Sequence, residues 1–127
     1  MKFAKSTLIT LATLIAVTQF SMTGYAAEEK PVDPKKIMAL YRRHCASCHG
    51  TDGKGDTKAG KKSGVKDYTD AKVVAELKDE KKAVKHILEG MKDEDGKTLM
   101  APFNKKLKPM EAVGLVKFLK HFGAKKD

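Results

Sequence analysis

The segment 45–50 (CASCHG) constrains this chain more than any other stretch, because it holds both cysteines of the 127 residues. Two cysteines three positions apart share one face of a helical turn, and a histidine follows the second cysteine directly. Thiols in this spacing can add to the two vinyl groups of a haem, and the adjacent imidazole then lies under the iron. The pattern predicts covalent haem attachment at Cys45 and Cys48, with His49 as an axial ligand.

Two other kinds of site use the same cysteine spacing. A disulfide redox pair usually follows a strand in a βαβ unit, and no strand-like run precedes Cys45. A zinc site needs four ligands, and the sequence offers no further cysteine and no second ligand cluster at a useful spacing. Both alternatives are weaker than haem attachment.

Residues 1–26 have the form of a bacterial secretory signal peptide. Lys2 and Lys5 give a positive start, residues 7–18 carry no charge, and Gly24 and Ala26 are small residues suited to cleavage before residue 27. An uncleaved anchor is less favoured, because the apolar run is shorter than the ~20 residues that cross a bilayer. We expect export to the periplasm and no membrane span after cleavage.

Cleavage would leave 101 residues with 24 basic and 16 acidic side chains, because the removed segment holds two lysines and no acid. A chain of this size is one small domain with a modest core, which an apolar prosthetic group would help to complete. A basic balance can indicate nucleic acid binding, but export and the lack of any recognition element argue against it.

The hydrophobic periodicity predicts an all-α fold, with no convincing strand. The first helix is expected to begin at Pro34 after an Asp33 N-cap and to run into Cys45. Further helices are expected over residues 71–78, 79–89 and 109–122. The folded domain would span 34–123, between a flexible leader at 27–33 and a basic tail at 124–127.

Three segments between these helices carry no helical periodicity. The Gly- and Lys-rich segment 50–64 is expected to be a loop, and 93–97 a turn. Segment 98–103 (TLMAPF) is an apolar island in lysine-rich surroundings, so it needs a surface to pack against.

With these features in place, residues 34–122 resemble a class I cytochrome c, the small soluble kind with a single haem. The resemblance rests on Tyr41 before the 45–50 motif, the helix end at 87–90, the Met-Ala-Pro-Phe run at 100–103, and a last helix carrying Phe118 and Leu119. It implies a compact fold of about four helices around one covalent haem c, with the first and last helices crossing.

Two positions depart from that family's usual pattern. Ile37 stands where the family usually has a small residue at the helix crossing, which predicts a wider or shifted crossing. No proline lies between His49 and Pro102, although many members have one whose carbonyl accepts a hydrogen bond from the proximal histidine. Another carbonyl within residues 50–66 is therefore expected to orient His49.

The second axial ligand of the iron is predicted to be Met100, which lies between helices, precedes a proline, and occupies the place of the axial methionine in similar proteins. Met91 is the runner-up, whereas Met38 and Met110 are expected in the core. Histidine ligation on this side is not expected. His44 precedes Cys45 on a turn committed to the opposite face. His86 and His121 lie on helix positions flanked by lysines.

His/Met ligation raises the reduction potential and closes the iron to substrates. We therefore expect a monomeric single-electron carrier and not an enzyme. The alternative is a haem enzyme or gas sensor with a labile sixth ligand.

Lysines dispersed around the expected haem edge predict redox partners with acidic docking surfaces. They are Lys54, Lys58, Lys61, Lys62, Lys92, Lys97, Lys105, Lys106 and Lys108.

Overall fold

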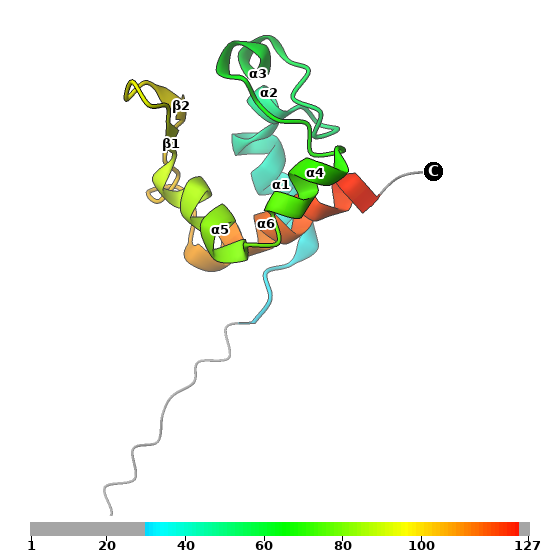
Figure 1. Cartoon of the computed structure of the whole chain (residues 1–127). Helices are drawn as coiled ribbons and strands as arrows, with labels where there is room; N and C mark the ends of the chain where they lie inside the picture. The colour runs from blue at the N-terminus through cyan, green and yellow to red at the C-terminus, as the bar shows by residue number, and fades with distance from the viewer. Residues whose placement is uncertain (1–29, 125–127) are drawn as a thin grey trace, which may run out of the picture.

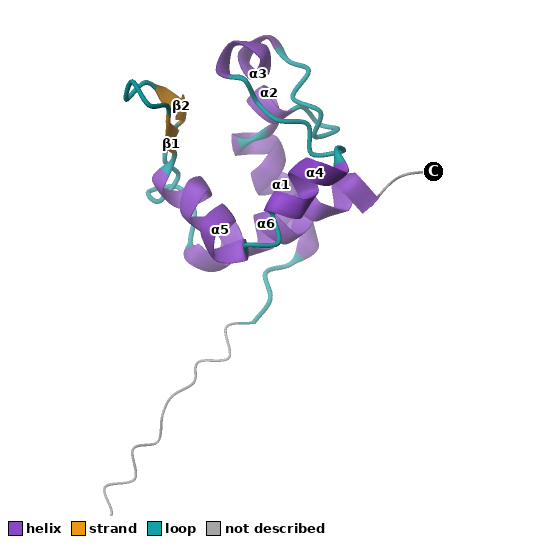
Figure 2. Cartoon of the chain, in the orientation of Figure 1, coloured by secondary structure: helices purple, strands orange, loops and turns teal. Residues whose placement is uncertain are grey.

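The computed structural model describes residues 30–124. Within this range the chain forms a helical domain with one small hairpin (Figure 2). The expected all-α class is confirmed. The elements, in chain order, are α1 (Pro34–His44), α2 (Ala46–His49), α3 (Lys58–Ser63), α4 (Ala71–Glu76), α5 (Glu80–Glu89), β1 (Met91–Lys92), β2 (Thr98–Met100) and α6 (Pro109–Ala124).

Helix α1 begins where its capping residues predict. The Asp33 side chain accepts a hydrogen bond from the Lys35 amide at 2.8 Å, and Pro34 occupies the first helical position, where a missing N–H costs nothing. Ile37 and Tyr41 are the buried residues of this helix. Cys45 follows α1 directly, and α2 then carries the chain through the second cysteine to His49.

Helix α6 packs against α1, α4 and α5, and so forms the floor of the domain (Figure 1). Its apolar face supplies four of the ten residues of the buried hydrophobic core. Gly114 lies where α6 meets α1, against the Ile37 side chain. The isoleucine in α1 predicts a wider crossing of the two helices. The glycine in α6 instead leaves room for that side chain, so the helices can approach closely. The core consists of Ile37, Tyr41, Leu77, Ala83, Ile87, Leu107, Ala112, Leu115, Val116 and Leu119.

The prediction that 50–64 is entirely loop is wrong, because α3 lies inside it. Thr57 caps this helix by accepting a hydrogen bond from the Gly60 amide at 2.8 Å, and Gly64 ends it in the left-handed conformation. A β-carbon at Gly60 would clash with the carbonyl oxygens of Cys48 and Gly55. The helix exists because these contacts fold it onto the 45–50 motif, and its own sequence has no apolar stripe.

Helices α4 and α5 were both predicted, and each starts at an aspartate cap. Asp70 accepts a hydrogen bond from Lys72 at the start of α4, and Asp79 accepts one from Lys82 at the start of α5. Gly90 ends α5 with a φ of 77°, a conformation that favours glycine. Helix α4 is shorter than predicted and ends at Glu76.

The prediction that no strand occurs is also wrong: β1 and β2 pair antiparallel, with Met91 opposite Met100. Strands of two and three residues are too short to show an alternation of apolar and polar residues in the sequence. The expected turn at 93–97 closes the hairpin. The backbone amides of Phe103 and Asn104 then donate to carbonyls in the last turn of α5, at distances between 3.0 and 3.2 Å. The hairpin and the apolar island are thereby tied back to the helices (Figure 1).

The predicted signal peptide lies outside the described residues, as do the first three residues of the leader and the last three residues of the tail. Val32, within the predicted leader, packs against the core. Among residues 30–124, none of the helices combines the length and apolar character that a membrane crossing needs.

Candidate haem site

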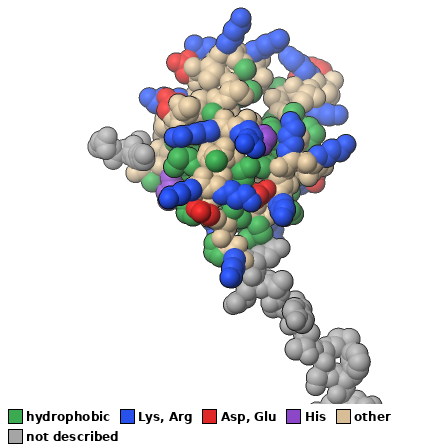
Figure 3. Space-filling model, turned by 180° about the vertical axis from the view of Figure 1, so that it is seen from behind, with side chains coloured by type: hydrophobic (Ala, Val, Ile, Leu, Met, Phe, Trp, Pro, Cys, Tyr) green, Lys and Arg blue, Asp and Glu red, His purple; other side chains and the backbone are tan. Residues whose placement is uncertain are grey.

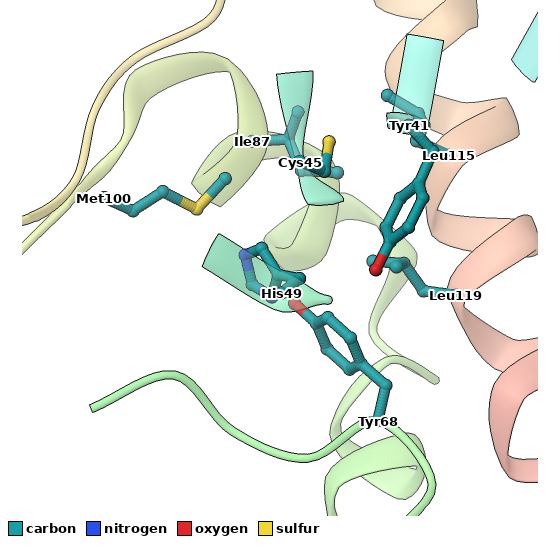
Figure 4. Close-up of a pocket in the computed structure, with 8 residues that line it drawn as sticks. All are labelled: Tyr41, Cys45, His49, Tyr68, Ile87, Met100, Leu115 and Leu119. Atoms are coloured by element: carbon teal, nitrogen blue, oxygen red, sulfur yellow. The ribbon is translucent and has the colours of Figure 1, made fainter. Parts of the chain in front are cut away.

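A pocket opens between the 45–50 motif, the hairpin and α6 (Figure 4). Its walls come from segments far apart in the sequence and are largely apolar. The Met100 side chain extends from the hairpin into the space beside the His49 imidazole, while the ring of Tyr68 lies on the other side of that imidazole. The lining residues are Tyr41, Cys45, His49, Tyr68, Ile87, Met100, Leu115 and Leu119.

The two cysteines lie on one turn of backbone. The amides of Cys48 and His49 both donate to the Cys45 carbonyl, at 3.1 and 2.9 Å. Both thiols are free. Burial raises the pKa of Cys45 to about 11, with a further contribution from Cys48. A disulfide redox pair needs a thiolate and hence a lowered pKa, so this environment suits it poorly.

The zinc alternative also lacks support in the described part of the chain. No group of three or more His, Cys, Asp or Glu side chains gathers there in a way that could hold a metal ion. The motif therefore stands without the additional ligands that a structural zinc site requires.

The His49 side chain is partly buried, and this burial lowers its pKa. A neutral imidazole is the form that binds a metal. Its Nδ1 atom is buried without a hydrogen-bond partner among the described residues. The prediction that a carbonyl within 50–66 orients this ring is therefore wrong. Instead, Tyr68 stacks on it, with ring centroids 5.1 Å apart and ring planes 17° from parallel.

Both methionines proposed as axial ligands lie on the hairpin. Met100 lines the pocket, whereas Met91, its partner across the two strands, is 38% exposed. Met38 is 42% exposed, so its predicted core position is wrong. Met110 is partly buried in a different groove.

The remaining histidines do not reach the pocket lining. His44 instead faces the Phe103 ring, at 6.0 Å between centroids. His86 is partly buried, and His121 is exposed.

Two hydrogen bonds that residue patterns do not reveal fix the backbone of the motif. The Tyr41 hydroxyl donates to the Gly50 carbonyl at 2.7 Å, and the Thr57 hydroxyl donates to the Cys48 carbonyl at 2.8 Å. Tyr68 was not singled out from the sequence either. A lone tyrosine in a polar loop gives no periodicity by which to recognise a site residue.

These observations fit a flat apolar group that carries a metal. The pocket has apolar walls, a neutral imidazole and a thioether enter it, and two adjacent free thiols lie on the turn that bears the imidazole. Soft sulfur and imidazole ligands together are a donor set of haem iron.

The comparisons with known proteins agree with this chemistry. The family model described as Cytochrome c matches residues 35–123. The chain belongs to the cytochrome c family. The solved structure of the KustC0563 c-type cytochrome is 34% identical to this chain, with a TM-score of 0.57. That similarity covers 67% of this chain and 94% of the other. No curated protein matches the chain.

This cytochrome c is of class I and has the all-α fold of that class. Its cofactor is one covalently bound haem c, for which Cys45 and Cys48 are in place. It is an electron carrier that works with redox partners, and cytochromes of this family are typically found outside the cytoplasm.

Proposed function

We propose that this cytochrome c is a periplasmic single-electron carrier with His/Met axial ligation. Cys45 and Cys48 hold the haem through thioether bonds, His49 binds one side of the iron, and Met100 binds the other. When bound, haem c supplies an iron that gains and loses one electron. Residues 1–26 are removed on export, and the domain of residues 34–123 acts as a monomer.

The observation that carries this proposal is that β2 brings Met100 to the pocket that His49 enters (Figure 4). A thioether is a soft neutral ligand that favours the reduced iron. With both axial positions taken by the chain, small molecules are kept from the metal. The side chains of Ile87, Leu115 and Leu119 make the pocket apolar and exclude water.

Substitution of the two hairpin methionines tests the ligand assignment. Met100→Ala should change the visible absorption spectrum of the exported holoprotein and lower its reduction potential. Met91→Ala is the matched control, because it removes the same side chain from the paired position on β1. An unchanged spectrum in Met100→Ala, or a larger change in Met91→Ala, would refute Met100 as the ligand.

Carbon monoxide distinguishes the carrier from an enzyme or gas sensor with a labile sixth ligand. The untreated ferrous protein should not bind carbon monoxide, whereas Met100→Ala should. Rapid binding by the wild-type protein would favour the alternative.

Docking to acidic partners is supported by the distribution of charge. The nine lysines predicted to surround the haem edge are all exposed. Seen from behind, the molecule carries Lys and Arg side chains spread widely over its surface, with few acids between them (Figure 3). Lys61 pairs with Asp56 at 2.6 Å, but such an exposed pair leaves the positive field largely intact. A positive surface of this kind accelerates encounter with acidic proteins at low salt.

A further inference from the structure

The orientation of the His49 imidazole needs an explanation, because its usual anchor is missing. A metal-binding histidine normally donates a hydrogen bond from its second nitrogen, which fixes the plane of the ring and raises its basicity. Here Nδ1 is buried and has no partner in the described chain. Something other than a hydrogen bond must restrict rotation of this ring.

Tyr68 supplies such a restriction by its shape. Its ring lies almost parallel to the imidazole, at 17° between planes and 5.1 Å between centroids, which is an offset stack. Rotation of the imidazole about its Cβ–Cγ bond would drive the ring edge into the face of the phenol. The phenol ring therefore restricts the plane of the imidazole ring without any polar contact between the two.

The stack can do this only if Tyr68 is itself held in place. Its amide donates to the Gly53 carbonyl at 2.8 Å. Gly53 is pressed against α6, since a β-carbon there would come within 2.7 Å of the Phe122 ring. On the other side, the Asp67 carboxylate accepts hydrogen bonds from both the amide and the hydroxyl of Thr69, each at 2.7 Å.

The loop that holds Tyr68 is also connected to the backbone of His49. The Gly55 amide, two residues after Gly53, donates to the His49 carbonyl at 2.8 Å. The phenol and the imidazole are thus carried by two backbone segments that are hydrogen-bonded through one short loop. These backbone hydrogen bonds keep the two segments that carry the rings next to each other.

We propose that Tyr68 is a positioning residue for the proximal ligand: its ring, and not its hydroxyl, sets the plane of the His49 imidazole and shields Nδ1 from water. This inference rests on the proposed role of His49 as axial ligand. It has an electronic consequence as well as a geometric one. A histidine whose Nδ1 has no acceptor is a weaker electron donor, and this favours the reduced iron.

Two variants of the exported holoprotein separate the ring from the hydroxyl. Tyr68→Phe should preserve both the reduction potential and the pattern of haem methyl shifts in the ferric NMR spectrum, which reports axial ligand orientation. Tyr68→Leu should alter that pattern and lower the potential, because water then reaches Nδ1. Val84→Ala is the control for loss of packing alone, because Val84 is partly buried against the core but does not line the pocket. This variant should lower thermal stability without changing the reduction potential.

The proposal is overturned if Tyr68→Leu keeps the wild-type shift pattern and potential, or if Tyr68→Phe changes them as much as Tyr68→Leu. A measurement on the wild type covers the case in which Tyr68→Leu does not fold. The diamagnetic ferrous protein should show nuclear Overhauser contacts between the Tyr68 and His49 rings, and their absence would refute the stack. If Met100 is not the ligand, carbon monoxide bound to the ferrous iron keeps the protein diamagnetic, so a failed Met100 assignment leaves the test of Tyr68 intact.

Discussion

Gly114 of α6 lies directly against Ile37 of α1, so that a β-carbon at Gly114 would come within 2.5 Å of the Ile37 Cδ1 atom. The isoleucine is only 4% exposed and has little room to move. The contact joins the first and last helices, which carry Tyr41 and Leu115 to the same pocket. The spacing of these two helices therefore sets how far apart Tyr41 and Leu115 lie in the pocket wall.

Gly114→Ala should destabilise the protein even though alanine is the better helix former. Overpacking of a buried contact costs about 1–3 kcal/mol, more than the helix propensity of alanine returns. Chemical denaturation of the holoprotein measures the effect. In the background of Ile37→Val, which removes the clashing methyl group, the same alanine should cost less. Equal costs in both backgrounds would mean that the close contact does not exist.

Thr57→Val should weaken the attachment of α3 to the 45–50 motif. The Thr57 hydroxyl both donates to the Cys48 carbonyl and accepts from the Gly60 amide. Loss of a helix cap together with one hydrogen bond to a backbone carbonyl should cost about 1–2 kcal/mol in unfolding free energy. Thr57→Ser is the control, because it keeps the hydroxyl, and it should remain within about 0.5 kcal/mol of the wild type. Similar losses in the two variants would exclude the hydroxyl as the cause.

Glu111 should make stability depend on acid pH. Its side chain accepts hydrogen bonds from Lys36 at 2.7 Å and from the Lys108 amide at 2.8 Å, and these contacts hold its pKa below the ordinary value of 4.5. A carboxyl group whose pKa is lowered on folding stabilises the protein above its unfolded pKa, and loses that contribution as pH falls through the folded pKa.

Glu111→Gln should therefore cost about 1 kcal/mol at neutral pH, and the cost should disappear in acid. Thermal unfolding followed from pH 7 to well below pH 4.5 would show the two curves converging. Curves that remain parallel across this range would contradict the role of the Glu111 charge. Glu94→Gln, an exposed change in the hairpin turn, serves as the reference for a carboxylate without these partners.

Electron exchange with small anionic oxidants should slow as salt is added. A positive surface field attracts an anionic reagent such as ferricyanide, and added salt should reduce the rate by about tenfold. A cationic cobalt complex should show the opposite dependence. Lys106, which lies over the ring of Phe103, three residues beyond Met100, should matter more than Lys35 in the first turn of α1. Equal effects of Lys106→Gln and Lys35→Gln would argue against a localised field.

The parts of the fold that were predicted from sequence have local causes. Asp33 and Pro34 start α1 through contacts within four residues, and Gly90 ends α5 because its backbone conformation favours glycine. The 45–50 motif is equally local, since its three reactive groups lie within five positions. These features do not need the rest of the molecule to be recognised.

The parts that were missed depend on contacts between distant segments. Helix α3 forms because Gly60 fits beneath the Cys48 carbonyl, and nothing in its own composition indicates this. The hairpin is stabilised by the pairing of Met91 with Met100, too short a pairing to leave a pattern. The stack of Tyr68 on His49 joins the last residue of α2 to a loop residue between α3 and α4, and only the folded chain brings the two together.

The hydrogen bonds from Phe103 and Asn104 to the end of α5 have a consequence for the speed of electron transfer. Together with Gly90 they close the segment that carries Met100 at both of its ends. With Met100 as ligand, the iron–sulfur bond belongs to a closed and anchored loop, which resists displacement when the charge on the metal changes. Little rearrangement at the iron would then accompany each electron transfer, so electron self-exchange between two molecules is expected to be fast.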